Sequence, residues 1–374
     1  MSDNTFIQPQ KSNNKAPIIL GVSVGLVIVL VMSYFGYNKD KDSPIISPIA
    51  KDQTEKPNNK TVMHPITGVM YTPQEAEKFI NHRPLGVMVN NHVDARPQSG
   101  LDKADITYEI VAEGGITRFL TFFQTSIPDK VGPIRSTREY YLVLVKELGD
   151  AMLMHIGWSP QALEAIESWP VRSLGRGGAP FYRDPSRNVA VEHTAYSDGN
   201  SLIERGMELG WSGVSENFVS WKFKDSPEKY SSFPDATNIA IDFWYKGDYS
   251  SGFKYNPQNN SYLRFMGYDE NDLLIPHIDN ETKKQLEVKN FIVMYAVETP
   301  ITGDTSGRLE YELIGSGNAV VFIDGKQIPA TWSKVSRDER TMFYDENGNE
   351  IEFNRGPFWI SIVPSRNIDQ VVIN

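Results

Sequence analysis

The stretch "VNNHVDARPQSGLDKADITYEIVAEGGITRF", residues 89–119, holds two strand-like runs joined by a glycine pair. The run "DITYEIVAE" (105–113) is rich in β-branched and aromatic residues, and "GGITRF" (114–119) continues as its partner. A Gly-Gly pair between two such runs is typical of a tight hairpin, because glycine adopts the positive φ that these turns require. The stretch therefore predicts an antiparallel pair of strands.

The hairpin has a predicted register. If Gly114 and Gly115 form a two-residue turn, Glu109 and Glu113 share one face with Arg118. The two glutamates would then lie about 13 Å apart at Cα. Glycosidase carboxylates lie about 5–9.5 Å apart, so this pair alone does not make a glycosidase. The register predicts a structural Glu-Arg-Glu ladder, with a ligand-facing acid as the alternative.

The wider pattern predicts two regions. Strands and helices alternate over residues 63–220, which indicates an α/β (or α+β) domain. Helical spacing is missing from residues 230–374, where apolar runs are broken by turn pairs such as Asn347-Gly348. The sequence therefore predicts an N-terminal α/β domain followed by a mainly β C-terminal domain.

A transmembrane helix is predicted over residues 16–37, with the apolar run Ile18–Tyr37 crossing the bilayer in a single pass. It separates a short cytoplasmic tail, 1–15, from a polar linker, 38–62. A cleaved signal peptide is the main rival, but its apolar region is about 7–15 residues long and ends in small residues. Lysine counts do not favour a cytoplasmic N-terminus. The layout of a short tail and a large C-terminal body places the folded domains outside the cytoplasm.

Composition excludes some classes of function. With a net charge of −10 and a pI near 5.2, the chain is not expected to bind nucleic acid generally. Its six histidines show no paired ligand spacing, so neither a metal site nor a cofactor is predicted. The absence of cysteine excludes anchoring through a lipidated cysteine.

An anion site is predicted at "VGPIRSTREYY", residues 131–141. Ser136 is a candidate helix N-cap and Glu139 would complete a capping box. The helix N-terminus, with Arg135 and Arg138 beside it, favours phosphate or carboxylate. The alternative is plain capping with surface arginines.

The segment "MHIGWSPQAL", residues 154–163, leads from a buried strand into a helix. Ser159 before Pro160 is predicted to be an N-cap. The alternative, a nucleophile elbow, requires a glycine two residues after the serine, where this chain has Gln161. His155 at the strand end is expected to point toward the ligand crevice of the sheet. Trp158 either stacks on a sugar ring or is buried.

A glycine- and proline-rich loop follows and carries four arginines: Arg172, Arg176, Arg183 and Arg187. Such a loop suits a diphosphate or a polyanionic polymer, and solvated charges are the alternative. The ligand-binding candidates are Arg96, Glu109, Glu113, Arg118, Arg135, Ser136, Arg138, His155, Trp158, Arg176 and His193. No catalytic residue is assigned.

Several motifs together resemble the YerB-like bacterial lipoproteins, a two-domain family of unknown function. The matching segments are "HPITG" (64–68), "ARPQSGLDKADITYEIVAEGGITRF" (95–119), "VGPIRSTREYY" (131–141), "MHIGWSPQA" (154–162), "EHTAYSD" (192–198), "GSGNAVVFIDGKQIPATWSK" (315–334) and "TMFYDENGNEIEFNRGPFWISIVP" (341–364). The resemblance spans about residues 64–370. It implies an extracytoplasmic, envelope-associated protein and no established reaction. This chain departs from the pattern in having a helix in place of the lipidated cysteine.

Two classes of function follow. The first is a non-catalytic, membrane-anchored module that binds an anionic glycan or a lipid-linked precursor, or docks on cell-wall synthesis proteins. The second is an envelope enzyme: a hydrolase using Glu113 or Glu192 with His193, or a phosphotransferase. The layout is similar to that of LytR-CpsA-Psr phosphotransferases, and "SIPDK" (126–130) echoes one of their segments. Asp129 stands where that family has an arginine, which argues against the phosphotransferase.

Overall fold

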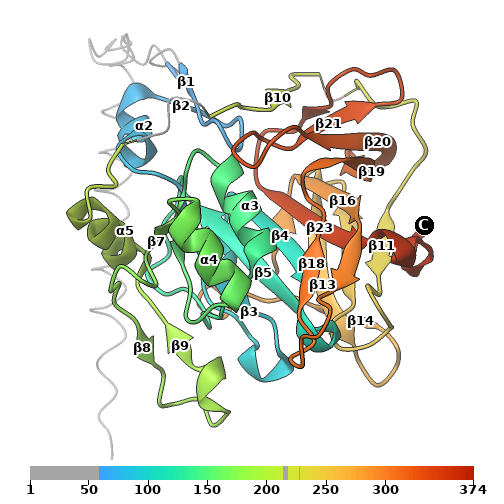
Figure 1. Ribbon diagram of the computed structural model, residues 1–374. Helices are drawn as coiled ribbons and strands as arrows, with labels where there is room; N and C mark the ends of the chain where they lie inside the picture. The colour runs from blue at the N-terminus through green and yellow to red at the C-terminus, as the bar shows by residue number, and fades with distance from the viewer. Residues whose placement is uncertain (1–58, 214–217, 227) are drawn as a thin grey trace, which may run out of the picture. The chain divides into compact units, whose positions relative to one another are not determined.

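A ten-stranded mixed sheet forms the centre of the computed structural model, which describes residues 59–213, 218–226 and 228–374 (Figure 1). Across the sheet the strands follow the order β21 (Met342–Asp345), β20 (Lys326–Lys334), β19 (Gly315–Ile323), β16 (Asn290–Ala296), β23 (Phe358–Pro364), β4 (Ile106–Val111), β5 (Thr117–Phe123), β3 (Leu85–Asn90), β6 (Met152–Met154) and β7 (Arg172–Ser173). The first five strands in this order come from the second half of the chain and the last five from the first half.

Strand β23 joins the two halves. It pairs in parallel with β16 on one side and with β4 on the other, so Ser361 lies between Val293 and Glu109. All seven residues of β23, "FWISIVP", are buried. Buried parallel strands are nearly continuous apolar runs of this kind. The sheet of the first half therefore continues directly into the second half.

The α-helices of the described residues all precede residue 210. They are α2 (Pro73–Ile80), α3 (Glu139–Glu147), α4 (Pro160–Ser168) and α5 (Gly199–Glu208). Helix α4 begins as predicted, because Ser159 accepts a hydrogen bond from Ala162 N and Pro160 takes the first helical position. Helices α3 and α4 pack against each other on one face of the sheet (Figure 1). Short 3-10 turns are η2 (Val93–Ala95), η3 (Leu101–Lys103), η4 (Glu113–Gly115), η5 (Val191–His193) and η6 (Ser365–Gln370).

A second sheet is built from the C-terminal region. Its strands follow the order β14 (Leu274–Pro276), β13 (Ser261–Tyr268), β12 (Ser251–Asn256), β11 (Asn238–Ile241) and β24 (Val371–Ile373), with β15 (Glu287–Val288) also beside β13. Four two-stranded ladders complete the described strands: β1 (Val62–Met63) with β2 (Met70–Tyr71), β8 (Tyr182–Arg183) with β9 (Ala195–Tyr196), β10 (Lys222–Phe223) with β22 (Glu352–Phe353), and β17 (Glu298–Pro300) with β18 (Leu309–Tyr311). The prediction of an α/β region followed by a mainly β region is confirmed.

The second sheet packs on the central one through aromatic rings and one ion pair. Phe253 of β12 stacks on Phe291 of β16 with ring centroids 3.7 Å apart. Arg264 of β13 reaches Glu109 of β4 at 2.8 Å, and both side chains are fully buried. Glu109 also accepts a hydrogen bond from the indole of Trp359 at 3.1 Å. These contacts fix Glu109 inside the protein, away from ligands.

The β4–β5 hairpin differs from its predicted register by one residue. Arg118 lies opposite Ile110, and Phe119 lies opposite Glu109. The turn has three residues, Glu113–Gly115, where two were predicted. A one-residue change turns every side chain of a strand to the other face. The Glu109–Arg118 part of the predicted ladder is therefore wrong, since these two residues occupy opposite faces, whereas Arg118 does pair with Glu113 at 2.8 Å.

The predicted capping box is also wrong. Helix α3 begins only at Glu139, and its N-cap is Arg138, which makes no side-chain capping bond. The Ser136 hydroxyl instead donates to the carbonyl of Ile156 at 2.9 Å. Residues 134–137 remain extended because backbone hydrogen bonds hold them between neighbouring segments.

The predicted cytoplasmic tail (1–15), transmembrane helix (16–37) and linker (38–62, up to residue 58) lie outside the described residues. Among the residues that are described, we find no helix with the length and apolar character needed to cross a membrane.

Candidate functional site

The predicted anion segment crosses the carboxyl end of β3. Asn90 N donates to Pro133 O at 2.8 Å, and Arg135 N donates to Met88 O at 2.9 Å. On its other side, the Arg135 carbonyl accepts from Ile156 N at 3.1 Å. These bonds fix the backbone from which the Arg135 side chain projects.

One carboxylate serves two of the arginines. Glu113 forms a 2.8 Å ion pair with Arg118 and a bidentate ion pair with Arg138. Burial alone would raise the pKa of Glu113, but the hydrogen bond from Arg138 and the charge of Arg118 outweigh it and lower the pKa. Glu113 is thus held ionised, which does not suit a general acid. Two guanidinium groups against one carboxylate leave a net positive charge.

Arg135 extends this positive charge. Its half-buried guanidinium makes neither a hydrogen bond nor an ion pair with any described residue. Burial lowers the pKa of Arg135, and the nearby positive charges of Arg118 and Arg138 lower it further. The negative charges of Glu192 and Glu113 raise it, but by less. The five donors of this guanidinium are available in an electropositive environment. We call the group Glu113, Arg118, Arg135 and Arg138 the arginine cluster.

A histidine pair lies beside the arginine cluster. The rings of His92 and His193 stack with centroids 4.4 Å apart. The Asn90 side-chain oxygen accepts from His92 N at 3.0 Å, so its nitrogen donates to His193 Nδ1 at 2.8 Å. Burial is the main cause that lowers the pKa of His193, and the charges of His92 and Arg135 lower it further. The loops that carry the two rings have no shared sequence pattern, so sequence reasoning missed the pair.

The histidine pair and Asp94 have ligand atoms within 4.8 Å of one another, which is close enough to consider a metal ion. Since His193 Nδ1 accepts a hydrogen bond from Asn90, the remaining proton of the neutral ring sits on Nε2. Neither nitrogen of His193 then offers a free lone pair. The three residues are not arranged as a preformed metal site.

His155 is enclosed by the protein. Its Nδ1 donates to Gly157 O at 2.9 Å, and its Nε2 accepts from the Ser173 hydroxyl at 2.7 Å. Burial lowers the pKa of His155 to about 4. The expectation that His155 faces a ligand crevice is wrong, because both ring nitrogens are satisfied inside.

Trp158 is the exposed member of its segment, with 41% of its surface accessible. Its ring meets that of His155 edge-on, with centroids 5.9 Å apart, and the Arg176 guanidinium lies over it at 5.7 Å. Thr137 bridges to Trp158 through the backbone, which connects this indole to the segment of the arginine cluster. An exposed indole near cationic groups suits stacking on a sugar ring.

The four loop arginines do not converge. Each has its own partner: Arg172 with Asp150, Arg176 with Glu167, Arg183 with the Val191 carbonyl, and Arg187 with the carbonyls of Asp94 and Arg96. Arg96 also has a partner, because it donates a hydrogen bond to Asp248 O at 2.7 Å. Burial and, to a smaller extent, the positive charge of Arg264 lower the pKa of Arg96 to about 10. The structure thus brings together Glu113, Arg118, Arg135 and Arg138 and separates the other arginines.

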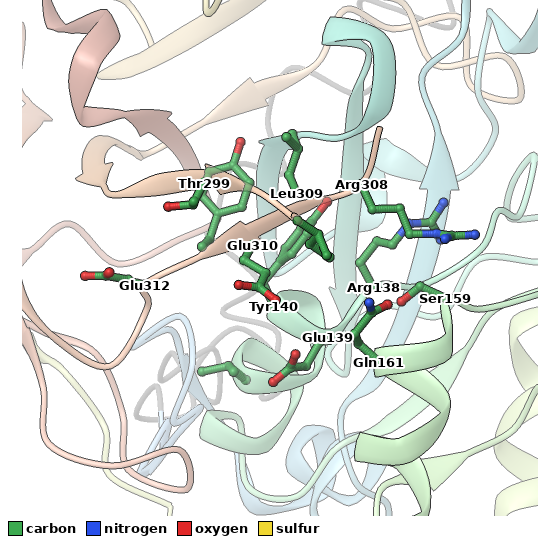
Figure 2. Close-up of a pocket in the computed structure, with 13 residues that line it drawn as sticks. Arg138, Glu139, Tyr140, Ser159, Gln161, Thr299, Arg308, Leu309, Glu310 and Glu312 are labelled. Atoms are coloured by element: carbon green, nitrogen blue, oxygen red, sulfur yellow. The ribbon is translucent and has the colours of Figure 1, made fainter. Parts of the chain in front are cut away.

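A cavity of about 360 Å³ opens next to the arginine cluster, with Arg138 in its wall (Figure 2). It lies between the first residues of α3 and α4 and the β17–β18 ladder. Sequence reasoning missed it because its two walls come from opposite halves of the chain.

Comparison with known proteins gives consistent matches. The family model described as "Protein of unknown function (DUF3048) N-terminal domain" matches residues 66–212, and the C-terminal domain of the same description matches 239–360. "Putative lipoprotein YerB" of Bacillus subtilis (strain 168) is 31% identical over 309 residues, which cover 82% of this chain and 87% of that protein. The crystal structure of YerB from Bacillus subtilis aligns with a TM-score of 0.70 at 28% identity, covering 84% of this chain and 99% of the solved chain.

The two matched segments together include β3 to β7 and most strands of the C-terminal region, so they span the sheet that positions the arginine cluster. The family resemblance seen in the sequence motifs is confirmed. The chain belongs to the DUF3048 family of proteins of unknown function, to which it is joined by both domain models and by its likeness to YerB.

Proposed function

We propose that this chain is a membrane-associated, extracytoplasmic protein that binds an anionic envelope ligand at the arginine cluster. Its relationship to YerB, whose name assigns it to the lipoproteins, supports the location. The apolar run Ile18–Tyr37 is the proposed anchor. The ligand class is a phosphate-bearing glycan or a lipid-linked precursor.

The observation that carries this proposal is the unpaired guanidinium of Arg135. A half-buried arginine normally has a carboxylate or carbonyl partner, because the desolvated charge needs compensation. Here the neighbouring cations Arg118 and Arg138 add repulsion. An anion bound at Arg135 would relieve both costs, and phosphate matches a guanidinium fork in geometry.

Two further features favour a phosphate-bearing glycan. The exposed indole of Trp158 offers a flat apolar face suited to a sugar ring. The stacked His92 and His193 lie beside the cluster, and the His193 Nε2 proton makes that nitrogen a hydrogen-bond donor. A charged group with a sugar attached would use both kinds of contact.

The test is equilibrium binding of the full-length chain, held in detergent micelles, to a poly(glycerol phosphate) polymer. The Arg135→Ala substitution should weaken binding about tenfold, the equivalent of about 1.4 kcal/mol for one charge-assisted contact. Raising the salt concentration should reduce this difference, since exposed charges are screened.

Lys254→Ala is the matched control, because Lys254 is an exposed cation on β12 in the other sheet. It should leave binding unchanged. If Arg135→Ala and Lys254→Ala bind the polymer as tightly as the original chain, the cluster is not the anion site. Polyglutamate in place of the polymer reports whether phosphate or carboxylate is preferred.

A further inference from the structure

Two lysines of the described residues are buried, Lys224 and Lys334. Lys334 forms an ion pair with Glu147 at 2.9 Å, and the other side chains bonded to that carboxylate are hydroxyls. Lys224 forms an ion pair with Asp324, also at 2.9 Å, and its Nζ donates to Ser226 O at 3.1 Å. The Lys224 pair differs from the Lys334 pair because its carboxylate also holds asparagine side chains.

An asparagine lies beside Lys224 on the neighbouring strand. Strands β10 and β22 run in parallel, with Phe223 opposite Phe353, and Lys224 N donates to Phe353 O at 2.9 Å. The next residue along each strand is Lys224 on one and Asn354 on the other, so the two side chains leave the same face of the ladder. Both residues are buried, with 7% and 9% of their surface exposed.

The Asp324 carboxylate contacts both of these side chains. Its Oδ2 lies 2.9 Å from Lys224 Nζ, and its Oδ1 accepts a hydrogen bond from Asn354 Nδ2 at 2.9 Å. Asn260 Nδ2 donates to the same Oδ1 at 2.7 Å. Asp324 stands in the tight turn between β19 and β20, where Asp324 and Gly325 both have positive φ, so the hairpin fixes its position. A lysine amine and an asparagine carboxamide are thus held against one acid.

Aromatic rings surround this group. Three tyrosines lie close enough to Asp324 for its charge to raise their pKa, after the larger effect of burial: Tyr230, Tyr255 and Tyr262. Rings of this kind lower the local dielectric constant, which favours the neutral amine and acid over the ion pair. A neutral lysine amine is a nucleophile, whereas its ammonium is not.

We propose that Lys224 and Asn354 are joined by an amide bond between Lys224 Nζ and Asn354 Cγ, with Asp324 as the acid and base of its formation. Asp324 first takes a proton from the ammonium, which leaves a neutral amine, and the acid so formed donates that proton to the carboxamide. Nζ then attacks Cγ, and the bond from Cγ to Nδ2 breaks. Nδ2 leaves as ammonium with its own two hydrogens and two protons from Lys224, so Asp324 ends ionised as it began.

Fixed contact between the reacting groups takes the place of a separate enzyme. Groups held in the right geometry react as if at a concentration of up to about 10⁵–10⁸ M. No oxidant or further reactant is needed, because the step exchanges one nitrogen on the carbonyl carbon for another.

The bond ties the segment between the two family matches to the C-terminal region. Residue 224 lies after the first match, 66–212, and before the second, 239–360, which contains Asn354. The chain has no cysteine, so no disulfide can restrain it. A bond from Lys224 to Asn354 closes a long loop and restrains the unfolded chain as a disulfide does. Its formation does not depend on the arginine cluster.

The test is the mass of the full-length chain after denaturation, measured on the intact protein and on its tryptic peptides. The intact chain should be about 17 Da lighter than its sequence requires, which is the mass of one ammonia. Trypsin should not cleave after Lys224, and peptide 223–229 should be recovered joined to peptide 341–355. Lys224→Arg and Asn354→Ala should each have the mass of their own sequence. Asp324→Ala keeps both reacting groups and should also lose the bond.

Two controls address other routes to the same mass. Asn347, which precedes Gly348, can lose one ammonia by closing on its own backbone. Asn347→Gln removes this route and should keep the loss of about 17 Da. Asn260→Ala removes the other amide on the Asp324 carboxylate and should keep the loss as well.

An intact mass equal to that of the sequence would overturn the proposal, and so would a loss that disappears in Asn347→Gln. A loss of about 18 Da with Lys224 joined to Asp324 would show that the carboxylate, and not Asn354, is the acceptor. The mass and the joined peptides are measured on the original chain, so a variant that fails to fold does not affect them.

Discussion

Arg264 and Glu109 form a 2.8 Å ion pair in which neither side chain has any exposed surface. The two residues belong to different sheets, and the same arginine nitrogen also bonds the Ser251 hydroxyl at 2.9 Å. The Trp359 ring lies under the guanidinium at 4.1 Å. This network fastens the second sheet to the centre of the main one.

Replacing Arg264 by Met should cost about 3–5 kcal/mol of unfolding free energy, because it leaves the buried Glu109 charge without a partner. Denaturant unfolding monitored by tryptophan fluorescence measures the loss. The Glu109→Met, Arg264→Met double variant should recover part of it, since no buried charge is left. A single variant as stable as the original chain would show that the pair is not important for stability.

The buried ring of His155 predicts a stability loss in mild acid. Its folded pKa is about 4, below the ordinary value of 6.5. The unfolded chain therefore takes up a proton first, so this contribution is complete above pH 6.5 and is lost as pH falls toward 4. The loss is roughly 3 kcal/mol.

The measurement compares the original chain with His155→Asn across this pH range. Other buried histidines, such as His277, titrate in both proteins and cancel in the difference. The stability gap between the two proteins should narrow as pH falls. Parallel pH profiles would exclude His155 as the cause.

Glu113→Gln should have opposite effects on stability and binding. The substitution removes the charge that Arg118 and Arg138 share, at a cost of about 1–3 kcal/mol in unfolding free energy. With both guanidinium groups released, affinity for poly(glycerol phosphate) should rise severalfold. Weaker polymer binding by a folded Glu113→Gln variant would mean that Glu113 itself contacts the ligand.

Gly175 allows the close approach of two segments. A Cβ placed there would lie 2.2 Å from the backbone oxygen of His155, which cannot move independently. Gly175→Ala should therefore destabilise the chain by about 1–3 kcal/mol. Gly247→Ala is the control, because its Cβ would meet nothing closer than 3.9 Å, and it should change stability by less than about 0.5 kcal/mol. Equal melting temperatures for the two variants would contradict the prediction.

Local chemistry made parts of the fold predictable. Ser159 before Pro160 specifies a helix start by itself, and the structure has it. The same reasoning wrongly predicted Ser136 as an N-cap, because its hydroxyl donates a hydrogen bond to the carbonyl of Ile156, which is distant in sequence. Tertiary hydrogen bonds override a local capping pattern when the backbone is already held in an extended form.

The candidate site was predictable only where its members are close in sequence. Arg135 and Arg138 share one segment, and Glu113 and Arg118 share one turn, so four candidates came together. Glu109 was misplaced because its partner Arg264 lies in the other half of the chain, where no local pattern points to it. A one-residue difference in a turn was enough to reverse its face.

The central position of β23 has a consequence for synthesis of the protein. The edge of β4 (Ile106–Val111) that pairs with β23 has no neighbour until residues 358–364 have been synthesised. While the intervening residues are synthesised, that edge exposes free backbone groups, a template for wrong pairing. Without β23, strands β4 and β16 lose the strand that pairs with both, so the two halves of the central sheet are no longer hydrogen-bonded to each other through it.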